Sequence, residues 1–95
     1  MERPDGAPTI QREVGARLRR RRCELGLSQE HVAYEVGMTQ GSISNYEVGR
    51  TDIPFTMLLR ICAALRTTPA DLIPTIPMGW TGGLAEPTQE TRLIA

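Results

Sequence analysis

The apolar residues recur at helical spacing through the middle of the chain. From Ile10 to Leu25 they fall four and seven positions apart, which places them on one stripe of an amphipathic helix. Gly26 predicts the end of this helix, because glycine commonly follows a helix C-terminus. The stripe consists of Ile10, Val14, Leu18 and Leu25.

Two short helices are predicted next, with only about three residues, "GMT", between them. Ser28 is a good N-cap for the first, and Gly37 ends it. Thr39 is a good N-cap for the second, which we expect over residues 39–48, before Gly49. The short connection predicts a tight helix–turn–helix. The expected inward residues are Val32, Ala33, Val36, Ile43 and Tyr46.

Two further helices complete the predicted fold. Pro54, at a first helical position, opens the fourth helix, whose apolar residues follow helical spacing: Leu58, Ile61, Cys62 and Leu65. Thr68 and Pro69 predict the start of a short fifth helix that ends before Pro74. No run of residues long enough for a strand alternates between apolar and polar side chains. We therefore predict an all-α fold, a compact five-helix domain over residues 10–74.

The two ends of the chain have a different composition. Residues 1–9 hold two prolines and a glycine with little to bury, which predicts a flexible N-terminal arm without a signal peptide. Residues 75–95 are rich in Pro, Gly and Thr, which predicts a disordered tail. Trp80 and the apolar residues around it favour the alternative, a segment that docks on a partner or a second subunit. No run of about 18 apolar residues exists, so no membrane span is predicted.

The net charge of zero hides an uneven distribution. Residues 11–66 hold nine arginines and six acidic residues, a net charge of 9 − 6 = +3, and the ends carry the compensating acids. Every basic residue is arginine. A mildly basic domain between weakly acidic ends is compatible with contacts to phosphate.

Cysteine and histidine usage argues against a metal centre. Cys23 and Cys62 lie far apart and His31 is the only histidine, so a four-ligand zinc site is not predicted, nor is any cofactor. We expect reduced thiols in a cytoplasmic protein. With no G-x-S-x-G motif and no second histidine, the chain is predicted not to be an enzyme.

The predicted helix over residues 39–48 carries uncharged hydrogen-bonding groups. Gln and Asn can form paired hydrogen bonds to adenine in the major groove, and Ser donates or accepts. An ordinary solvated helix, the alternative interpretation, more often carries Glu, Lys or Arg. Between the flanking glycines the only charged residue is Glu47, toward the far end. The predicted base-contacting residues are therefore Gln40, Ser42 and Asn45.

Over about residues 11–73 the chain resembles the Cro/cI-type family, the XRE-like, lambda-repressor-like helix–turn–helix DNA-binding domains. The resemblance rests on "GLSQEHVA", then "VGMTQGSISNYEVGR", then an apolar helix ending in "AL". It implies a lambda-repressor-like five-helix fold and a sequence-specific DNA-binding transcriptional regulator, a repressor. It also implies a homodimer on double-stranded DNA, with the dimer surface at Leu72, Ile73 and the tail.

The resemblance also implies roles for single residues. Gln40 contacts a base and packs against Gln29, which contacts a phosphate. Asn45 faces the groove or a nearby phosphate. The loop after this helix, with Arg50 and Thr51, contacts the DNA backbone.

The arginine run in the first helix is ambiguous. Four consecutive helical residues point in four directions, so Arg19, Arg20, Arg21 and Arg22 cannot all meet one phosphate strand. We predict phosphate contacts for Arg17 and Arg20. A solvated face explains Arg19 and Arg21 equally well.

The resemblance further implies a buried ion pair between Arg22 and Glu47, which makes Glu47 structural. The chain departs from the family pattern where Ile53–Pro54 replaces a polar cap. It also departs at Gly41, a position that often carries a base-reading side chain. Gly41 predicts either tolerance of any base pair beneath it or readout by close backbone approach.

Two other functions fit the same sequence. One is an antitoxin-type protein-interaction module whose tail binds a partner protein, with DNA binding secondary. The other is an adaptor that keeps the fold without reading bases.

Overall fold

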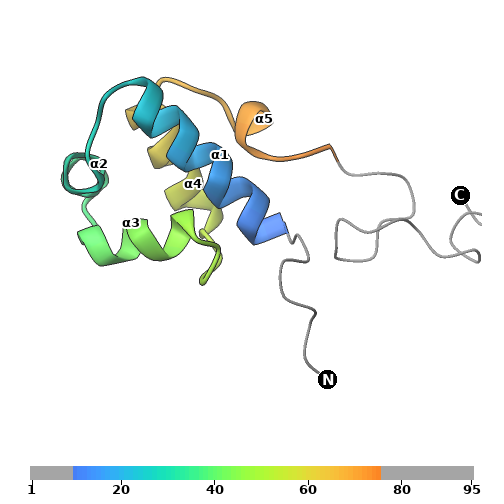
Figure 1. Cartoon of the computed structure of the whole chain (residues 1–95), viewed down its shortest axis with the longest axis horizontal. Coiled ribbons are helices and arrows are strands. Elements are labelled where there is room, and N and C mark those ends of the chain that lie inside the picture. The colour runs from blue at the N-terminus through green and yellow to red at the C-terminus, as the bar shows by residue number, and fades with distance from the viewer. Residues whose placement is uncertain (1–9, 76–95) are drawn as a thin grey trace, which may run out of the picture.

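The structure, a computed structural model, describes residues 10–75, which form five α-helices and no strand (Figure 1). The predicted all-α, five-helix fold is confirmed. The predictions of an N-terminal arm and of a partner-docking or antitoxin-type tail fall on residues 1–9 and 76–95, outside the described residues. The helices are α1 (Ile10–Glu24), α2 (Gln29–Val36), α3 (Gln40–Glu47), α4 (Phe55–Ala64) and α5 (Pro69–Leu72).

Helices α2 and α3 begin with the same kind of cap. The Ser28 hydroxyl oxygen accepts a hydrogen bond from the backbone N–H of His31 at 3.0 Å. The Thr39 hydroxyl oxygen accepts one from the backbone N–H of Ser42 at 3.1 Å. Gly37, with φ 74°, ends α2 in the left-handed conformation that glycine adopts without strain. These local signals fix the helix–turn–helix.

Helix α4 starts one residue later than predicted. Pro54 occupies the N-cap position, with ψ 145°, and not the first helical position, so α4 begins at Phe55. Proline has no side-chain acceptor, and no side-chain hydrogen bond caps this helix. Helix α1 ends at Glu24, one residue before Leu25.

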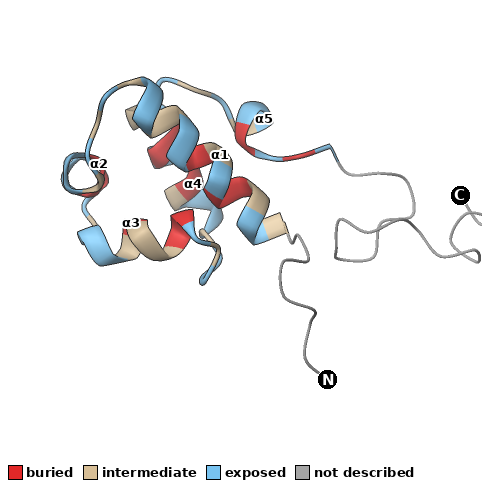
Figure 2. Ribbon diagram, viewed as in Figure 1, coloured by how far each residue is buried: buried red, intermediate tan, exposed pale blue. Residues whose placement is uncertain are grey.

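The core lies where α1, α2, α3 and α4 meet (Figure 2). A second cluster, which includes Leu72 of α5, joins α1, α4 and α5. The predicted inward residues are buried, except that Ile10 and Leu25, at the ends of the α1 stripe, are half-buried. Because Ile43 and Tyr46 of α3 point into the core, the opposite face of α3 points to solvent.

Glycine lets α1 and α3 approach closely at two points. A Cβ atom on Gly15 would lie 2.3 Å from the carbonyl oxygen of Tyr46 and 2.5 Å from that of Glu47. A Cβ atom on Gly49, where φ is 77°, would lie 2.8 Å from the Cα atom of Arg12. The flank of α1 that carries Gly15 therefore faces the end of α3.

Candidate nucleic-acid interface

The exposed front of α3 carries uncharged polar groups. Gln40 and Gly41 are exposed, and Ser42 and Asn45 are half-buried. Glu47, the charged residue of this helix, is buried on the core side. The three predicted base-contacting residues thus lie on one helix, and no charged side chain of α3 stands among them.

A chain of hydrogen bonds links this front to the interior. Gln40 Nε2 donates to Gln29 Oε1. Gln29 Nε2 donates to Glu47 Oε1 at 2.9 Å. Gln29 is the first residue of α2, so the two helices of the helix–turn–helix are joined at their N-terminal ends. The contact of Gln29 with Glu47 is one that the sequence did not predict.

Arg22 and Glu47 lie together at the inner end of this chain. Arg22 Nε donates to Glu47 Oε2 at 2.6 Å, and Arg22 Nη2 donates to Glu47 Oε1 at 3.0 Å. The side chains are 11% and 2% exposed. Arg22 Nη1 also donates to the carbonyl oxygen of Leu27 at 2.7 Å, and no buried side-chain nitrogen or oxygen among the described residues lacks a partner.

This pairing raises the pKa of Arg22 above its ordinary value, and the side-chain hydrogen bond to Glu47 is the largest cause. A basic group with a raised pKa stabilises the fold at every pH below its pKa in the unfolded state. This stabilisation is lost only at strongly alkaline pH. The Arg22 charge therefore does not change near neutral pH. An ion pair this well buried stabilises α3 only while both partners are present.

The far end of α3 carries the predicted loop contacts. Arg50 and Thr51 are both exposed in the loop that follows the helix. Arg50 Nη1 donates to Asn45 Oδ1 at 2.8 Å. This bond holds the Arg50 guanidinium beside the exposed face of α3 and leaves the Asn45 amide nitrogen free to donate elsewhere.

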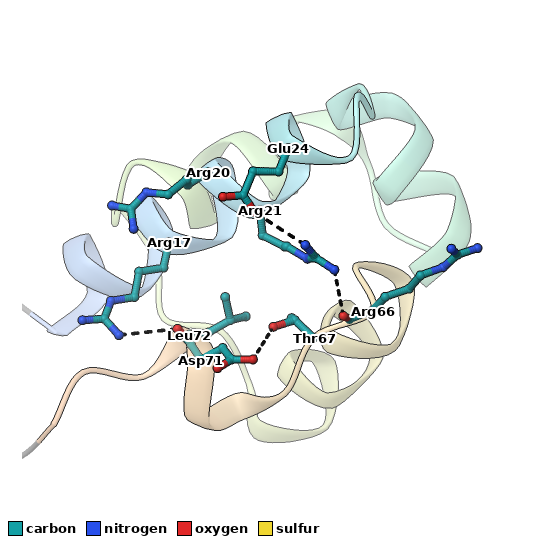
Figure 3. A pocket seen from close by; sticks show the side chains of 8 residues that line it. All are labelled: Arg17, Arg20, Arg21, Glu24, Arg66, Thr67, Asp71 and Leu72. Atoms are coloured by element: carbon teal, nitrogen blue, oxygen red, sulfur yellow. Dashed lines mark hydrogen bonds and ion pairs between the residues drawn. The ribbon is translucent and has the colours of Figure 1, made fainter.

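The structure does not bring Arg17 and Arg20 to α3. Both line a cavity of about 340 Å³ between α1 and the α4–α5 connection (Figure 3). Arg17 is 2.8 Å from Glu13 Oε2 and donates to the carbonyl oxygen of Asp71 at 3.4 Å. Arg17 and Arg20 therefore lie on a different flank of α1 from Gly15, whose flank faces α3.

Arg21 has a structural role that the sequence did not predict. Its Nε donates to the carbonyl oxygen of Leu65 at 2.9 Å. Its Nη2 donates to the carbonyl oxygen of Arg66 at 3.0 Å (Figure 3). These carbonyls lie at the end of α4, where backbone acceptors lack helical partners. The sequence gives no signal for this contact, because Leu65 and Arg66 lie 44 and 45 positions from Arg21 along the chain.

The remaining reactive groups are dispersed. Among residues 10–75, no group of three or more His, Cys, Asp or Glu side chains is placed to hold a metal ion. Cys23 is exposed, whereas Cys62 is buried, and burial raises the pKa of the Cys62 thiol. None of the described helices is long and apolar enough to cross a membrane.

Two capped short helices, a tight turn and three further helices around one core define a compact helix–turn–helix domain. The chain belongs to the helix-turn-helix domain family, whose model matches residues 13–73. The predicted lambda-repressor-like membership is thereby confirmed. No curated protein sequence matches the chain.

Solved structures of regulators are similar to this chain. The clp gene regulator ClgR from Corynebacterium glutamicum is 28% identical with a TM-score of 0.69, over 72% of this chain and 87% of that one. The restriction-modification controller protein C.AhdI from Aeromonas hydrophila is 31% identical with a TM-score of 0.63, over 65% of this chain and 94% of that one.

An enzyme also contains a similar fold. Hydroxypropylphosphonic acid epoxidase from S. wedmorenis is 24% identical with a TM-score of 0.68, over 74% of this chain and only 37% of that one. At this identity the likeness shows the fold alone.

Proposed function

We propose that the protein is a sequence-specific DNA-binding transcriptional regulator, a repressor, that inserts α3 into the major groove. The observation that carries the proposal is the uncharged hydrogen-bonding front of α3, whose only charged residue is buried. Helix–turn–helix domains place the second helix of the motif in the groove, with its N-terminal residues at the base edges. The similarity to regulators such as ClgR and C.AhdI supports the same function.

Gln40 is the residue best placed to read a base. One of its two amide N–H groups is used by Gln29. The other N–H and the carbonyl oxygen remain, and these are the two groups that a paired contact with adenine needs. Ser42 and Asn45 complete the proposed base-contacting set. The Asn45 carbonyl oxygen accepts from Arg50 and keeps a second lone pair, and the amide nitrogen keeps its N–H groups for a base.

Affinity would come from phosphate contacts on either side of α3. We assign these to Gln29 at the start of α2 and to Arg50 and Thr51 in the loop after α3. Arg17 and Arg20 stay predicted contacts, although they lie on the α5 side of α1.

Arg19 is a further proposed phosphate contact. It is exposed and lies one helical turn from Gly15, on the flank of α1 that meets α3. Around the helix axis, Arg19 lies closer than its neighbour Arg20 to the α3-facing flank.

We propose that the regulator binds as a homodimer through an apolar surface at α4 and the end of α5. Phe55, Leu59 and Ile73 are large apolar side chains that are 73%, 43% and 37% exposed, and Phe55 and Leu59 lie one turn apart on α4. Leu72 does not belong to this surface, because it is 2% exposed in the core of its own chain. Equilibrium sedimentation should give twice the chain mass, and the double change Phe55→Ser with Leu59→Ser should give the chain mass.

Selection from random duplex DNA, followed by gel-shift, tests the proposed function. We expect an enriched motif at moderate salt. Binding without any enriched motif would contradict base reading, and absence of binding at low salt would contradict DNA binding altogether. We also propose that the protein is cytoplasmic and acts without catalysis.

A further inference from the structure

Gly41 differs from the four other glycines in residues 10–75. Gly26, Gly37 and Gly49 have φ between 71° and 77°, a conformation that disfavours other residues. Gly15 leaves no space for a Cβ atom, because two backbone carbonyl oxygens lie within 2.5 Å of it. Backbone conformation or lack of space therefore favours glycine at each of these four positions.

The fold does not require glycine at position 41. The residue lies inside α3 and its φ is not positive. A Cβ atom there would meet a single atom within 4 Å, Thr39 Oγ1 at 3.9 Å, which is ordinary contact. Glycine lowers the stability of a helix relative to alanine. Gly41 thus weakens α3 with no compensating contact in the described residues.

The space that Gly41 leaves open lies at the exposed front of α3. Gly41 is exposed between Gln40 and Ser42, two proposed base-contacting residues. Ser42 has a short side chain, and its hydroxyl lies 3.0 Å from that of Thr39, so it stays close to the helix. A hydroxyl held so near the backbone reaches a base edge only if the helix itself approaches the base.

We propose that Gly41 is a specificity-determining residue that allows the first turn of α3 to approach the base edges. The inference rests on the proposed major-groove function. A side chain at position 41 would meet the floor of the groove first and hold Ser42 away from hydrogen-bonding distance. Gly41 therefore acts through its lack of a side chain, and the base pair beneath it is read by close contact with the backbone.

The test compares stability and DNA affinity in Gly41→Ala and Gly41→Leu. Gly41→Ala should raise the melting temperature by about 2–5 °C, because it removes the helical penalty of glycine. The same change should lower affinity for the duplex selected by the wild-type protein by about tenfold, the size of one lost base contact. Gly41→Leu should lower it further. Affinity for unrelated duplex DNA at low salt should change little, since phosphate contacts are retained.

Tyr34→Trp provides the control, because Tyr34 is 87% exposed on α2, belongs neither to the proposed DNA-contacting residues nor to the proposed dimer surface, and gains bulk. It should leave affinity for the selected duplex unchanged. If Gly41→Ala binds that duplex as tightly as the wild type does, or more tightly, the close-approach role is wrong while base reading stands. If the wild-type protein selects no motif, both the proposed function and this inference are wrong.

Discussion

Helices α2 and α3 are locally alike and chemically different. Each has eight residues, a hydroxyl cap and a glutamine at its first position. The exposed residues of α2 include Glu30, Glu35 and Tyr34, whereas the front of α3 carries no charge. Glu30 and Glu35 are the kind of charged residue that is typical of a solvated helix surface.

The difference separates α2, which we assign to the scaffold, from α3, the proposed base-reading helix. Equal caps and equal lengths produce the same local fold, so local structure does not assign a function to either helix. The acids on the outer face of α2 would be repelled by phosphates, and the neutral front of α3 would not. What distinguishes α3 is that its one acid, Glu47, is turned inward and paired with Arg22.

The largest expected effect comes from breaking this inward pair. Glu47→Gln leaves Arg22 buried without a counter-charge and should reduce the free energy of unfolding by about 3–5 kcal/mol. That is a large part of the stability of a small domain. Thermal unfolding followed by circular dichroism measures the loss.

Glu13→Gln is the matched control for that prediction. It removes the Glu13–Arg17 pair, whose side chains are 34% and 31% exposed, so the loss should stay below about 1 kcal/mol. Equal losses for the two variants would mean that the Glu47 pair does not hold α3 in place.

The second prediction concerns the close contact of α1 with α3. Gly15→Ala places a Cβ atom against two backbone carbonyl oxygens, so one helix must shift. We expect a loss of about 1–3 kcal/mol in the free energy of unfolding, as for overpacked cores. Urea unfolding provides the measurement. A variant as stable as the wild type would show that α1 does not pack on α3 through this flank.

The third prediction separates base reading from phosphate contact at the two ends of α3. Gln40→Ala should lower affinity for the selected duplex by about 1–3 kcal/mol and relax the preference at one or two base pairs. Arg50→Ala should weaken binding to all sequences and reduce the salt slope by about 1. Titrations at several salt concentrations measure both. A uniform loss across sequences for Gln40→Ala would exclude it as a reader.

The smallest expected effect distinguishes two adjacent arginines of α1. Arg19→Ala should reduce the salt slope of binding by up to about 1, because Arg19 lies on the α3 flank. Arg20→Ala should reduce the salt slope less, because Arg20 lines the cavity between α1 and the α4–α5 connection. A larger effect for Arg20→Ala would favour the original prediction from the sequence.

The sequence predicted the helix–turn–helix well because its signals are local. A hydroxyl cap, a helical stripe and a terminal glycine act within a few residues, and Ser28, Gly37 and Thr39 sit where they were expected. The start of α4 was misplaced by one residue, because Pro54 fits either a first helical or a capping position.

Helical spacing alone could not predict which flank of α1 faces α3, and only the resemblance pointed to it, through the implied Arg22–Glu47 pair. That choice depends on tertiary packing between residues about 30 positions apart, as between Gly15 and the carbonyl oxygens of α3. A glycine in the middle of a helix was the available signal, since it often marks a close helix contact. The position of Gly15 on the helix indicates that Arg17, Arg20 and Arg21 lie away from the α3-facing flank.

We expect α3, and not α2, to read bases. Selection from random duplex DNA with wild-type protein, Gln40→Ala and Tyr34→Ala tests it most directly. We predict one motif for the wild type, the same motif for Tyr34→Ala, and a motif degenerate at one or two positions for Gln40→Ala. An unchanged motif for Gln40→Ala together with an altered one for Tyr34→Ala would contradict the claim.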